Sequence, residues 1–567
     1  MATALPARVM LLGAGPVAPA RLVTSTFAPS SLVRALAAST PSRLSRARPP
    51  PIRASMTSAE PSSAPPARRV ARVAVVGAGA AGLAAARELK AEGHAVVVFE
   101  QARDVGGVWV YDPSVESDPL GRDDRRHRVH SSMYRSLRTN LPREVMGYES
   151  FPFTRVFGGD DRRFCGHAEV RAYLAAYAEH HDLAPLVRLG ARVVAARPKF
   201  DDDADVDVER WGPRWEVISS NPTNLENTVA ETYDAVVVCN GHYSEPRTPE
   251  FPGAEDWPGE QTHSHNYRDP EAFRGKTVVV LGAMASGEDL SREIAGVAKE
   301  VILAARGYAP NPDPDAGDFP ASSYPANFTR APGVTALERE HSAVRFEDGS
   351  VRQHVDVMLY ATGYHYDFPF LREDAAGVDE DAGVSNSNPS SSSLHCVSAE
   401  DNAVGPLYEH VFPPSVAPSL SFVGLPWKVV PFPQFELQSR WIARALSRGR
   451  LPSRDAMAEA AAEEEKARID AGIATRHAHR MGDAQWAYND RVAAACGDET
   501  LAGWRERMYK ATGARKRSAP TAYRDGPLPW TDEDAREEAR EEARARGFEV
   551  DQARDEWYHP NGVNRLV

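Results

Sequence analysis

The sequence has few cysteines and no long apolar run, and each absence argues against a class of protein. Only four cysteines occur among 567 residues, and no two of them form a CxxC pair. This argues against a zinc cluster built on cysteine pairs, a disulfide framework, and the paired redox cysteines of a disulfide reductase. No apolar run approaches the roughly 18 residues that a spanning helix needs, so we expect no membrane span.

Acidic residues are almost missing from the first 72 positions. That stretch holds ten Arg, no Lys and one acid, Glu60, so it carries a charge of +9 and leaves −22 for the rest of the chain. Such an acidic body argues against nucleic acid and anionic membranes as partners. The Ala-, Ser-, Pro- and Arg-rich leader over residues 1–68 has the composition of a transit peptide, which predicts a chloroplast protein. The alternative is a disordered leader that carries no targeting signal. The mitochondrion and the cytosol are the alternative locations.

A strand, a glycine turn, a helix and a second strand are predicted between Val73 and Glu100. The apolar run at 73–76 predicts the first strand, an Ala/Leu-rich stretch to about Glu92 the helix, and 95–99 a buried strand that ends in Glu100. Gly77 allows a tight turn, Gly79 lets the backbone approach a pyrophosphate, and Gly82 lets the helix pack closely on the strand. In such a unit, the acid at the end of the second strand binds a ribose 2′-hydroxyl. The residues predicted to bind a dinucleotide are Gly77, Ala78, Gly79, Ala80, Ala81, Gly82 and Glu100.

A second unit of the same kind begins at Lys276. A Val-rich strand leads into Gly282-Ala283-Met284-Ala285-Ser286-Gly287, which is followed by a predicted helix through about Val297. Met284 replaces the middle glycine, where the backbone would approach a pyrophosphate, so this unit departs from the dinucleotide pattern. The next strand ends in Arg306 instead of an acid, which favours the 2′-phosphate of NADPH. A structural salt bridge is the alternative role for Arg306.

Further stretches resemble the flavin-containing monooxygenases. Gly107, Val108 and Trp109 belong to a GGxW sequence that resembles an extension of the FAD site in this family. The stretch from Tyr134 resembles the family's YxSLxTNxxxxxM sequence, in which Asn140 matches an Asn beside the reactive edge of the flavin. On local sequence alone, Asn140 is a turn or helix-cap residue.

Residues 251–268 resemble the sequence that identifies the family, FxGxxxHxxxY/F, and physically we expect a linker into the second unit. The matching positions are Trp257, Gly259, His263 and Tyr267. Residues 361–364 resemble the family's ATGY motif, and 433–441 should begin a helix against the flavin. The plant glucosinolate S-oxygenase group also has a bulky residue within a GxxASG pattern, so Met284 points to that group. The resemblance spans roughly 73–452.

The resemblance implies an α/β fold with two Rossmann-like dinucleotide-binding domains, the FAD-binding domain being split by an inserted NADPH-binding domain. A C-terminal helical extension follows, and its end (535–546) is predicted to be a solvated helical face. The implied boundaries are a leader at 1–68, the first part of the FAD-binding domain at 69–250, the NADPH-binding domain at 251–360, the return segment at 361–452 with an insertion at 372–401, and the extension at 453–567. The acidic run 201–209 is expected at a hairpin tip.

The resemblance also implies an enzyme, an NADPH-dependent flavin monooxygenase that uses O2. In the family's mechanism NADPH reduces FAD, O2 adds at flavin C4a, and the hydroperoxide waits behind retained NADP until a soft nucleophile takes its distal oxygen. Because the cofactor carries the chemistry, few acid–base residues are needed. Asn140 is the candidate for holding the peroxide and NADP in place, and no metal site is expected.

The predicted reaction is the oxygenation of a small thioether to a sulfoxide. A thioether sulfur stays unprotonated at neutral pH, whereas most amines do not, so sulfur is the better nucleophile for an electrophilic oxidant. N-oxygenating and Baeyer–Villiger enzymes share nearly all these motifs and remain alternatives. A non-catalytic flavin-binding protein is the alternative of a different class. The sequence sets neither the identity of the substrate nor the oligomeric state.

Overall fold

The computed structural model describes residues 68–199, 208–221, 224–308, 325–372, 397–526 and 530–550, without the side chains of 224–226. The predicted leader up to residue 67, most of the acidic run and most of the insertion (373–396) lie outside the described residues. The last part of the acidic run, from residue 208, begins the short helix α4 (Val208–Trp211), which lies in the connection between the antiparallel strands β4 (Arg192–Lys199) and β5 (Arg214–Asn221), so the predicted hairpin is confirmed. None of the helices in the described ranges is long and apolar enough to cross a membrane.

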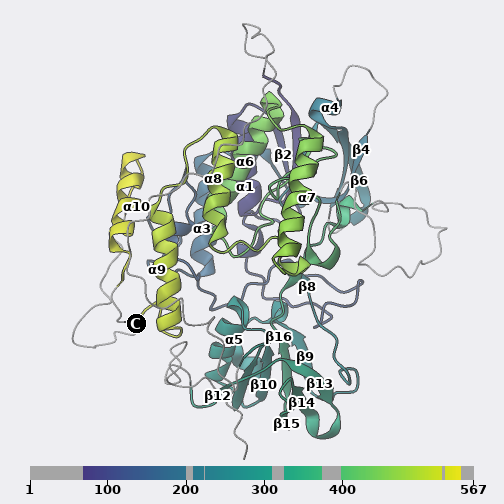
Figure 1. The fold of residues 1–567 in the computed structure, drawn as a ribbon, viewed down its shortest axis with the longest axis vertical. Helices are drawn as coiled ribbons and strands as arrows, with labels where there is room; N and C mark the ends of the chain where they lie inside the picture. Colours follow the sequence, from purple (N-terminus) through teal and green to yellow (C-terminus); the bar gives the residue numbers. More distant parts are fainter. Residues whose placement is uncertain are drawn as a thin grey trace, which may run out of the picture. The chain divides into compact units, whose positions relative to one another are not determined.

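Two five-stranded parallel sheets organise the chain (Figure 1). The first has the order β18 (Leu420–Phe422), β7 (Ala235–Val238), β1 (Arg72–Val76), β2 (Ala95–Glu100) and β3 (Val187–Leu189). The second has the order β12 (Phe328–Ala331), β11 (Glu300–Ala304), β10 (Thr277–Leu281), β16 (Val357–Tyr360) and β9 (Glu260–His263). All five strands of the second sheet lie between β7 and β18 in the sequence, so one domain is inserted into the other, as predicted.

Three smaller sheets complete the strands. An antiparallel sheet contains β4 (Arg192–Lys199), β5 (Arg214–Asn221) and β6 (Asn224–Tyr233). Another contains β13 (Val334–Glu338), β14 (Ala343–Phe346) and β15 (Val351–Arg352), and a two-stranded ribbon pairs β8 (Glu245–Pro246) with β17 (Tyr364–His365).

The longer helices have the following bounds: α1 (Ala80–Ala91), α3 (His167–His180), α5 (Ala285–Ala295), α6 (Pro431–Arg448), α7 (Arg454–Asp470), α8 (Ala484–Cys496), α9 (Trp504–Ser518) and α10 (Glu533–Ala545). A four-residue helix, α2 (Arg143–Met146), follows the Asn140 segment. Helix α6 ends at Gly449, which has a φ of 60°, the left-handed conformation that glycine adopts without strain.

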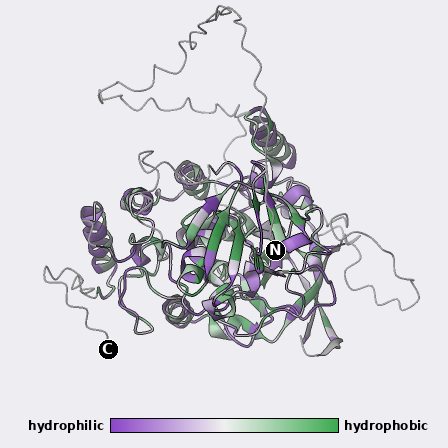
Figure 2. Ribbon diagram, turned by 90° about the horizontal axis from the view of Figure 1, so that it is seen from below, coloured by the Kyte–Doolittle hydropathy of each residue, from purple (hydrophilic) through white to green (hydrophobic). Residues whose placement is uncertain are grey.

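The core lies on both faces of the first sheet. Val73 and Val75 pack into one hydrophobic cluster with helices α1 and α6, while Ala74 and Val76 pack into another with Trp215 of β5. A strand buried on both faces reads as a continuous apolar run, which is why 73–76 could be predicted. Figure 2 shows the resulting pattern, with largely apolar strands inside and polar faces on the surrounding helices.

Two predictions about elements were wrong. The stretch 251–268 is not only a linker, because residues 260–263 form strand β9, which pairs with β16 at an edge of the second sheet. Helix α10 is not a solvated face, because Ala535, Ala539 and Ala543 are at most 3% exposed. These alanines follow an i, i+4, i+8 spacing, which places them on one face of the helix. Because most residues between them are charged, the whole segment was interpreted as a solvated face.

Candidate functional site

The first glycine turn joins β1 to α1. Gly77 has a φ of +102°, and a Cβ atom there would lie 2.6 Å from the carbonyl oxygen of Cys239 on the neighbouring strand. A Cβ atom at Gly82 would lie only 1.8 Å from the carbonyl oxygen of Gly77. Both positions therefore require glycine, one for the turn and one for the contact between helix and strand.

Gly79 and Gly107 face each other beside this turn. A Cβ atom on Gly107 would lie 2.9 Å from Cα of Gly79, and the Gly106 N–H donates to the Ala78 carbonyl at 3.0 Å. Gly79 is the N-cap of α1 and provides no side-chain cap for the first turn of the helix, where Ala80 and Ala81 lie. Uncapped N–H groups beside bare backbone suit a pyrophosphate, so these residues fit the FAD that the sequence predicts.

Glu100 closes the turn from the end of β2. Its side chain accepts the Ala78 N–H at 2.7 Å and the Ala102 N–H at 2.8 Å, and the residue is buried. The structure thus brings Glu100 to the glycine turn, as the sequence predicted. Its contact with a ribose hydroxyl stays a prediction.

The second glycine turn joins β10 to α5 with the same geometry. Gly282 has a φ of +109°, and a Cβ atom there would lie 2.3 Å from the Ala361 carbonyl oxygen. A Cβ atom at Gly287 would lie 1.6 Å from the Gly282 carbonyl oxygen. The first and third glycines therefore do the same work in both units.

Met284 occupies the position that Gly79 has in the first turn. Its backbone angles (φ −82°, ψ −171°) nearly match those of Gly79 (φ −74°, ψ −172°), and both residues precede a helix without capping it. These angles are extended, so any residue adopts them without strain. The Met284 side chain is 56% exposed, and its neighbours Ala285 and Ser286 are also exposed, while Ala283 is half-buried. The missing glycine does not distort the turn.

Arg306 is exposed just after β11, and two further arginines lie near it. Arg247 donates from Nη2 to the Thr362 carbonyl at 2.8 Å, beside the Ala361 residue that contacts the glycine turn. Burial lowers the pKa of Arg247, and the positive charges of Arg476 and Arg306 lower it further. The sequence analysis missed Arg247 and Arg476, because each comes from a distant segment and neither belongs to a motif.

Asn140 lies in a bend that precedes α2. The segment is anchored by the Thr139 N–H, which donates to the Cys165 carbonyl at 2.9 Å, and by a β-bridge between Arg138 and Gly166. Asn140 itself is exposed, and its side chain makes no hydrogen bond to any of the described residues. The N-cap of α2 is Pro142, so the helix-cap alternative for Asn140 is wrong.

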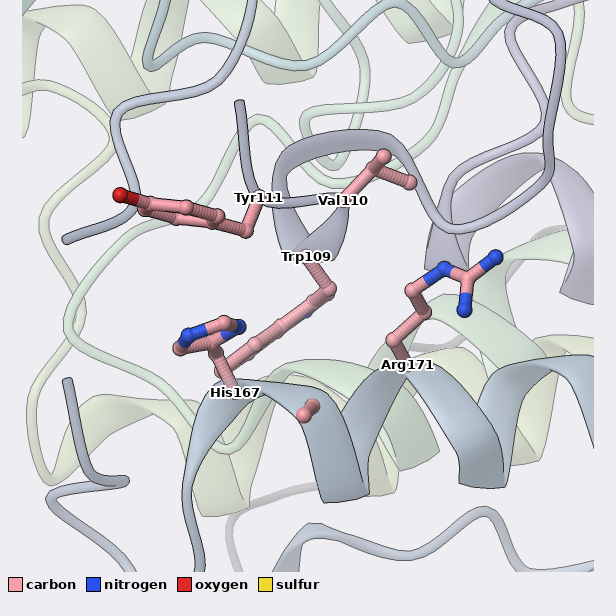
Figure 3. Close-up of a pocket in the computed structure, with 6 residues that line it drawn as sticks. Trp109, Val110, Tyr111, His167 and Arg171 are labelled. Atoms are coloured by element: carbon pink, nitrogen blue, oxygen red, sulfur yellow. The ribbon is translucent and has the colours of Figure 1, made fainter. Parts of the chain in front are cut away.

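A pocket of ≈ 330 Å³ lies directly beside Trp109. Figure 3 shows the Trp109 ring reaching toward His167, with Tyr111 on the same side and Arg171 on the other. The Tyr111 and His167 rings stack with centroids 5.4 Å apart. Burial lowers the pKa of His167, so the ring is neutral at neutral pH. This aromatic wall adjoins the first glycine turn through Gly107.

The identifying stretch around His263 is structural. His263 is fully buried, its Nδ1 accepts the His265 N–H at 3.0 Å, and burial lowers its pKa to about 3. A Cβ atom on Gly259 would meet the Trp257 ring at 2.3 Å, which explains the glycine. These residues build the edge of the second sheet.

Comparison with known proteins assigns the chain to a family. The profile of the family described as Flavin-binding monooxygenase-like matches residues 70–309, and that of Pyridine nucleotide-disulphide oxidoreductase matches 225–395. Flavin-containing monooxygenase FMO GS-OX-like 4 of Arabidopsis thaliana is 46% identical over 471 residues, which cover 80% of this chain and 93% of that protein. FMO GS-OX5 of the same plant is 43% identical over 466 residues, which cover 81% of this chain and 92% of that protein.

Solved structures agree with this assignment. The structure of S-allyl-L-cysteine S-oxygenase from Allium sativum is 41% identical, has a TM-score of 0.72, and covers 84% of this chain and 99% of that one. Tmm from Pelagibacter sp. strain HTCC7211, at 24% identity and a TM-score of 0.62, shares the fold.

This chain belongs to the flavin-containing monooxygenases, and its cofactors are FAD and NADPH. The motifs seen in the sequence lie within about 73–452. The alignment with FMO GS-OX-like 4 covers 80% of this chain, which is more than that stretch contains. The similarity therefore extends beyond the segment in which motifs were visible.

Proposed function

We propose that the chain oxygenates the sulfur of a small thioether to a sulfoxide, with O2 and NADPH as co-substrates. The observation that carries the proposal is the likeness to S-allyl-L-cysteine S-oxygenase, which extends over 99% of that chain. The resemblance of the Gly282–Gly287 turn to the plant glucosinolate S-oxygenase group points to sulfur as well.

The two glycine turns divide the work of binding. The first turn, with Glu100 and the Gly107–Trp109 segment, holds FAD, and the second holds NADPH through the N-terminus of α5. When bound, NADPH supplies a hydride and the flavin supplies an activated oxygen atom from O2. The protein therefore has to bind, orient and exclude water, and it needs no nucleophile of its own.

Arg306 gives this enzyme its preference for NADPH. It is exposed at the end of β11, where a dinucleotide domain places the ribose 2′-substituent, and Arg247 and Arg476 add positive charge beside it. A charge-assisted hydrogen bond to a phosphate is stronger than one to a hydroxyl. The three arginines together favour the dianionic 2′-phosphate.

Asn140 provides an amide for the reaction site. Its side chain is exposed and without a hydrogen-bond partner among the described residues, so its N–H2 and C=O are available to a bound ligand. The Thr139 and Arg138 backbone contacts fix the segment that carries it. In this role it orients the reduced and oxidised nicotinamide cofactor and the transferred oxygen.

The choice of sulfur is tested with a panel of substrates. Purified enzyme with NADPH and air is offered a methylthioalkyl glucosinolate, S-allyl-L-cysteine and trimethylamine in parallel, and products are identified by mass spectrometry. We expect a sulfoxide from at least one sulfide at a higher kcat/KM than any product from the amine. Efficient oxygenation of the amine alone would replace the proposal by the N-oxygenase alternative.

The protein acts in the chloroplast, and its leader is removed between about Arg53 and Arg69. The support is composition: ten Arg, no Lys and one acid in residues 1–72 ahead of an acidic body. A fluorescent protein fused behind residues 1–72 should accumulate in plastids of a plant cell. A fusion that stays in the cytosol would refute the location.

A further inference from the structure

The C-terminal extension holds the segment that carries Asn140. Arg505 of α9 is buried and donates from Nη1 to the carbonyl oxygens of Val145 and Gly147, each at 3.0 Å. Arg536 of α10 donates from Nε to the Glu144 carboxylate at 3.0 Å. The residues just after Asn140 are therefore fixed by side chains from more than 350 positions away in the sequence.

Arg524, between α9 and α10, contacts the residue directly before Asn140. Its Nε donates to the Thr139 carbonyl at 2.9 Å, and its Nη2 lies 3.4 Å from the Arg138 carbonyl. The same Nη2 donates to Oδ2 of Asp289 at 2.6 Å. Asp289 belongs to the second turn of α5, the helix that begins at the second glycine turn. One guanidinium thus joins the Asn140 segment to the helix that is expected to hold NADPH.

Neighbouring contacts hold Arg524 in this position. Oδ1 of Asp525 accepts a hydrogen bond from Nη2 of Arg138 at 2.9 Å, and Arg292 of α5 donates one to the Pro520 carbonyl. Tyr523 is 1% exposed and packs edge-on against Phe164, with ring centroids 5.5 Å apart. The chain from 520 to 525 is therefore pinned on both sides of Arg524.

The electrostatics agree with a firm bridge. Burial acts to lower the pKa of Arg524, but Asp289, Tyr523 and Tyr134 together outweigh it, and the pKa is raised. Burial also raises the pKa of the nearby Tyr134 hydroxyl, and Asp289 adds to that effect. Arg524 is therefore charged at neutral pH, and its partner Asp289 lies largely shielded from solvent.

We propose that Arg524 is a positioning residue that couples the Asn140 segment to the NADPH-binding helix. Its planar fork reaches a backbone carbonyl and a carboxylate at once, which a point charge such as Lys cannot do in the same geometry. The bridge fixes where the Asn140 amide lies relative to a nicotinamide cofactor bound at α5. This role rests on the proposed function of Asn140, whereas the bridge itself does not.

The test compares Arg524→Gln, Arg524→Lys and the control Arg507→Gln in the FAD-loaded, full-length enzyme. Arg507 lies in the same helical region and forms an exposed pair with Glu538, and within the described ranges neither side chain forms a hydrogen bond or ion pair with the Asn140 segment or α5. Hydrogen exchange of residues 138–141 and the share of consumed NADPH that appears as hydrogen peroxide are measured for each variant. FAD content and the urea midpoint are recorded as checks on folding.

We expect Arg524→Gln to keep its FAD and to exchange the 138–141 amides about tenfold faster than Arg507→Gln, because a charge-assisted hydrogen bond is lost. The share of consumed NADPH that appears as hydrogen peroxide should rise several-fold, and Arg524→Lys should not return it to the wild-type value. Wild-type exchange in Arg524→Gln, full rescue by Lys, or a loss of FAD in step with the loss of coupling would each overturn the proposal. A wild-type enzyme that binds FAD but consumes no NADPH would refute the proposed function instead, and the exchange data would still decide whether the bridge exists.

Discussion

At the scale of single residues, we expect charge rather than shape to set the choice of nicotinamide cofactor. Arg306 is exposed just after β11, and its positive charge and that of Arg476 add to the burial that lowers the pKa of Arg247. Like charges gathered in one place are unfavourable in the free protein, and at Arg247 the Asp401 carboxylate offsets only part of the effect. A bound phosphate dianion would relieve that repulsion.

Arg306→Ala should raise the KM for NADPH roughly 10- to 100-fold and leave the KM for NADH nearly unchanged, because a contact worth about 1.5–3 kcal/mol is lost only with the 2′-phosphate. Steady-state kinetics with both cofactors give the comparison. Arg345→Ala is the matched control, since Arg345 lies in β14 and pairs with Glu338 through an exposed contact. Equal effects on NADPH and NADH would return Arg306 to a structural role.

Asn140→Ala should bind FAD and be reduced by NADPH at rates close to those of the wild type, yet form hydrogen peroxide in place of oxygenated product. The amide has no partner among the described residues, so its removal leaves no buried group unsatisfied and the fold is unaffected. Loss of one positioned donor near a developing negative charge costs about 2.7–4 kcal/mol in other enzymes. Unchanged coupling between NADPH consumption and product would show that Asn140 is a bend residue only.

At the scale of elements, the glycine turns explain which motif positions are essential. Gly282→Ala should abolish NADPH binding or unfold the second domain, because its Cβ atom would lie 2.3 Å from the Ala361 carbonyl and φ is +109°. Met284→Ala changes an exposed side chain on extended backbone. We expect it to change the Kd of NADP+ by less than about threefold, whereas the glycine change costs about 1–3 kcal/mol or more. Titration of the flavin spectrum with NADP+ measures both, and equal losses would contradict the assignment of roles within the turn.

Strand β9 makes the stability of the protein dependent on pH. The pKa of His263 falls to about 3 because the side chain is buried, so the folded state binds the proton more weakly than the unfolded state does. The corresponding stability is complete above pH 6.5 and is lost as the pH falls toward 3. Between pH 6.5 and 5, the unfolding free energy should fall by roughly 2 kcal/mol more in the wild type than in His263→Gln. Urea titrations at the two pH values test this, and parallel decreases would contradict it.

Elements with local signals were predicted well, and those that depend on distant partners were not. The buried strands and the helices after each glycine turn follow from apolar runs and glycine spacing, which are local. Strand β9 was missed because an edge strand of four residues has no run long enough to recognise, and its partner β16 comes some 95 residues later. Helix α10 was misjudged because its three buried alanines carry little hydropathy among many charges.

At the scale of the whole molecule, the limits of the sequence are set by long-range contacts. The order of motifs predicted the insertion of one dinucleotide domain into the other, and the strand order of both sheets confirms it. No motif predicted that Arg247 and Arg476 would lie near Arg306, or that Arg524 would bridge Thr139 and Asp289. These arginines lie in stretches with no periodicity or glycine pattern, and only the packed chain brings each of them to its neighbours.

We propose that this chain transfers one atom of O2 to the sulfur of a thioether while NADPH is oxidised. The most direct measurement is a single reaction of the FAD-loaded enzyme with NADPH, S-allyl-L-cysteine and ¹⁸O₂, followed by mass spectrometry of the product. We expect a sulfoxide that carries one ¹⁸O atom and forms in equal amount to the NADPH consumed. Consumption of NADPH that gives hydrogen peroxide without sulfoxide from this or any other sulfide, or a sulfoxide whose oxygen comes from water, would contradict it.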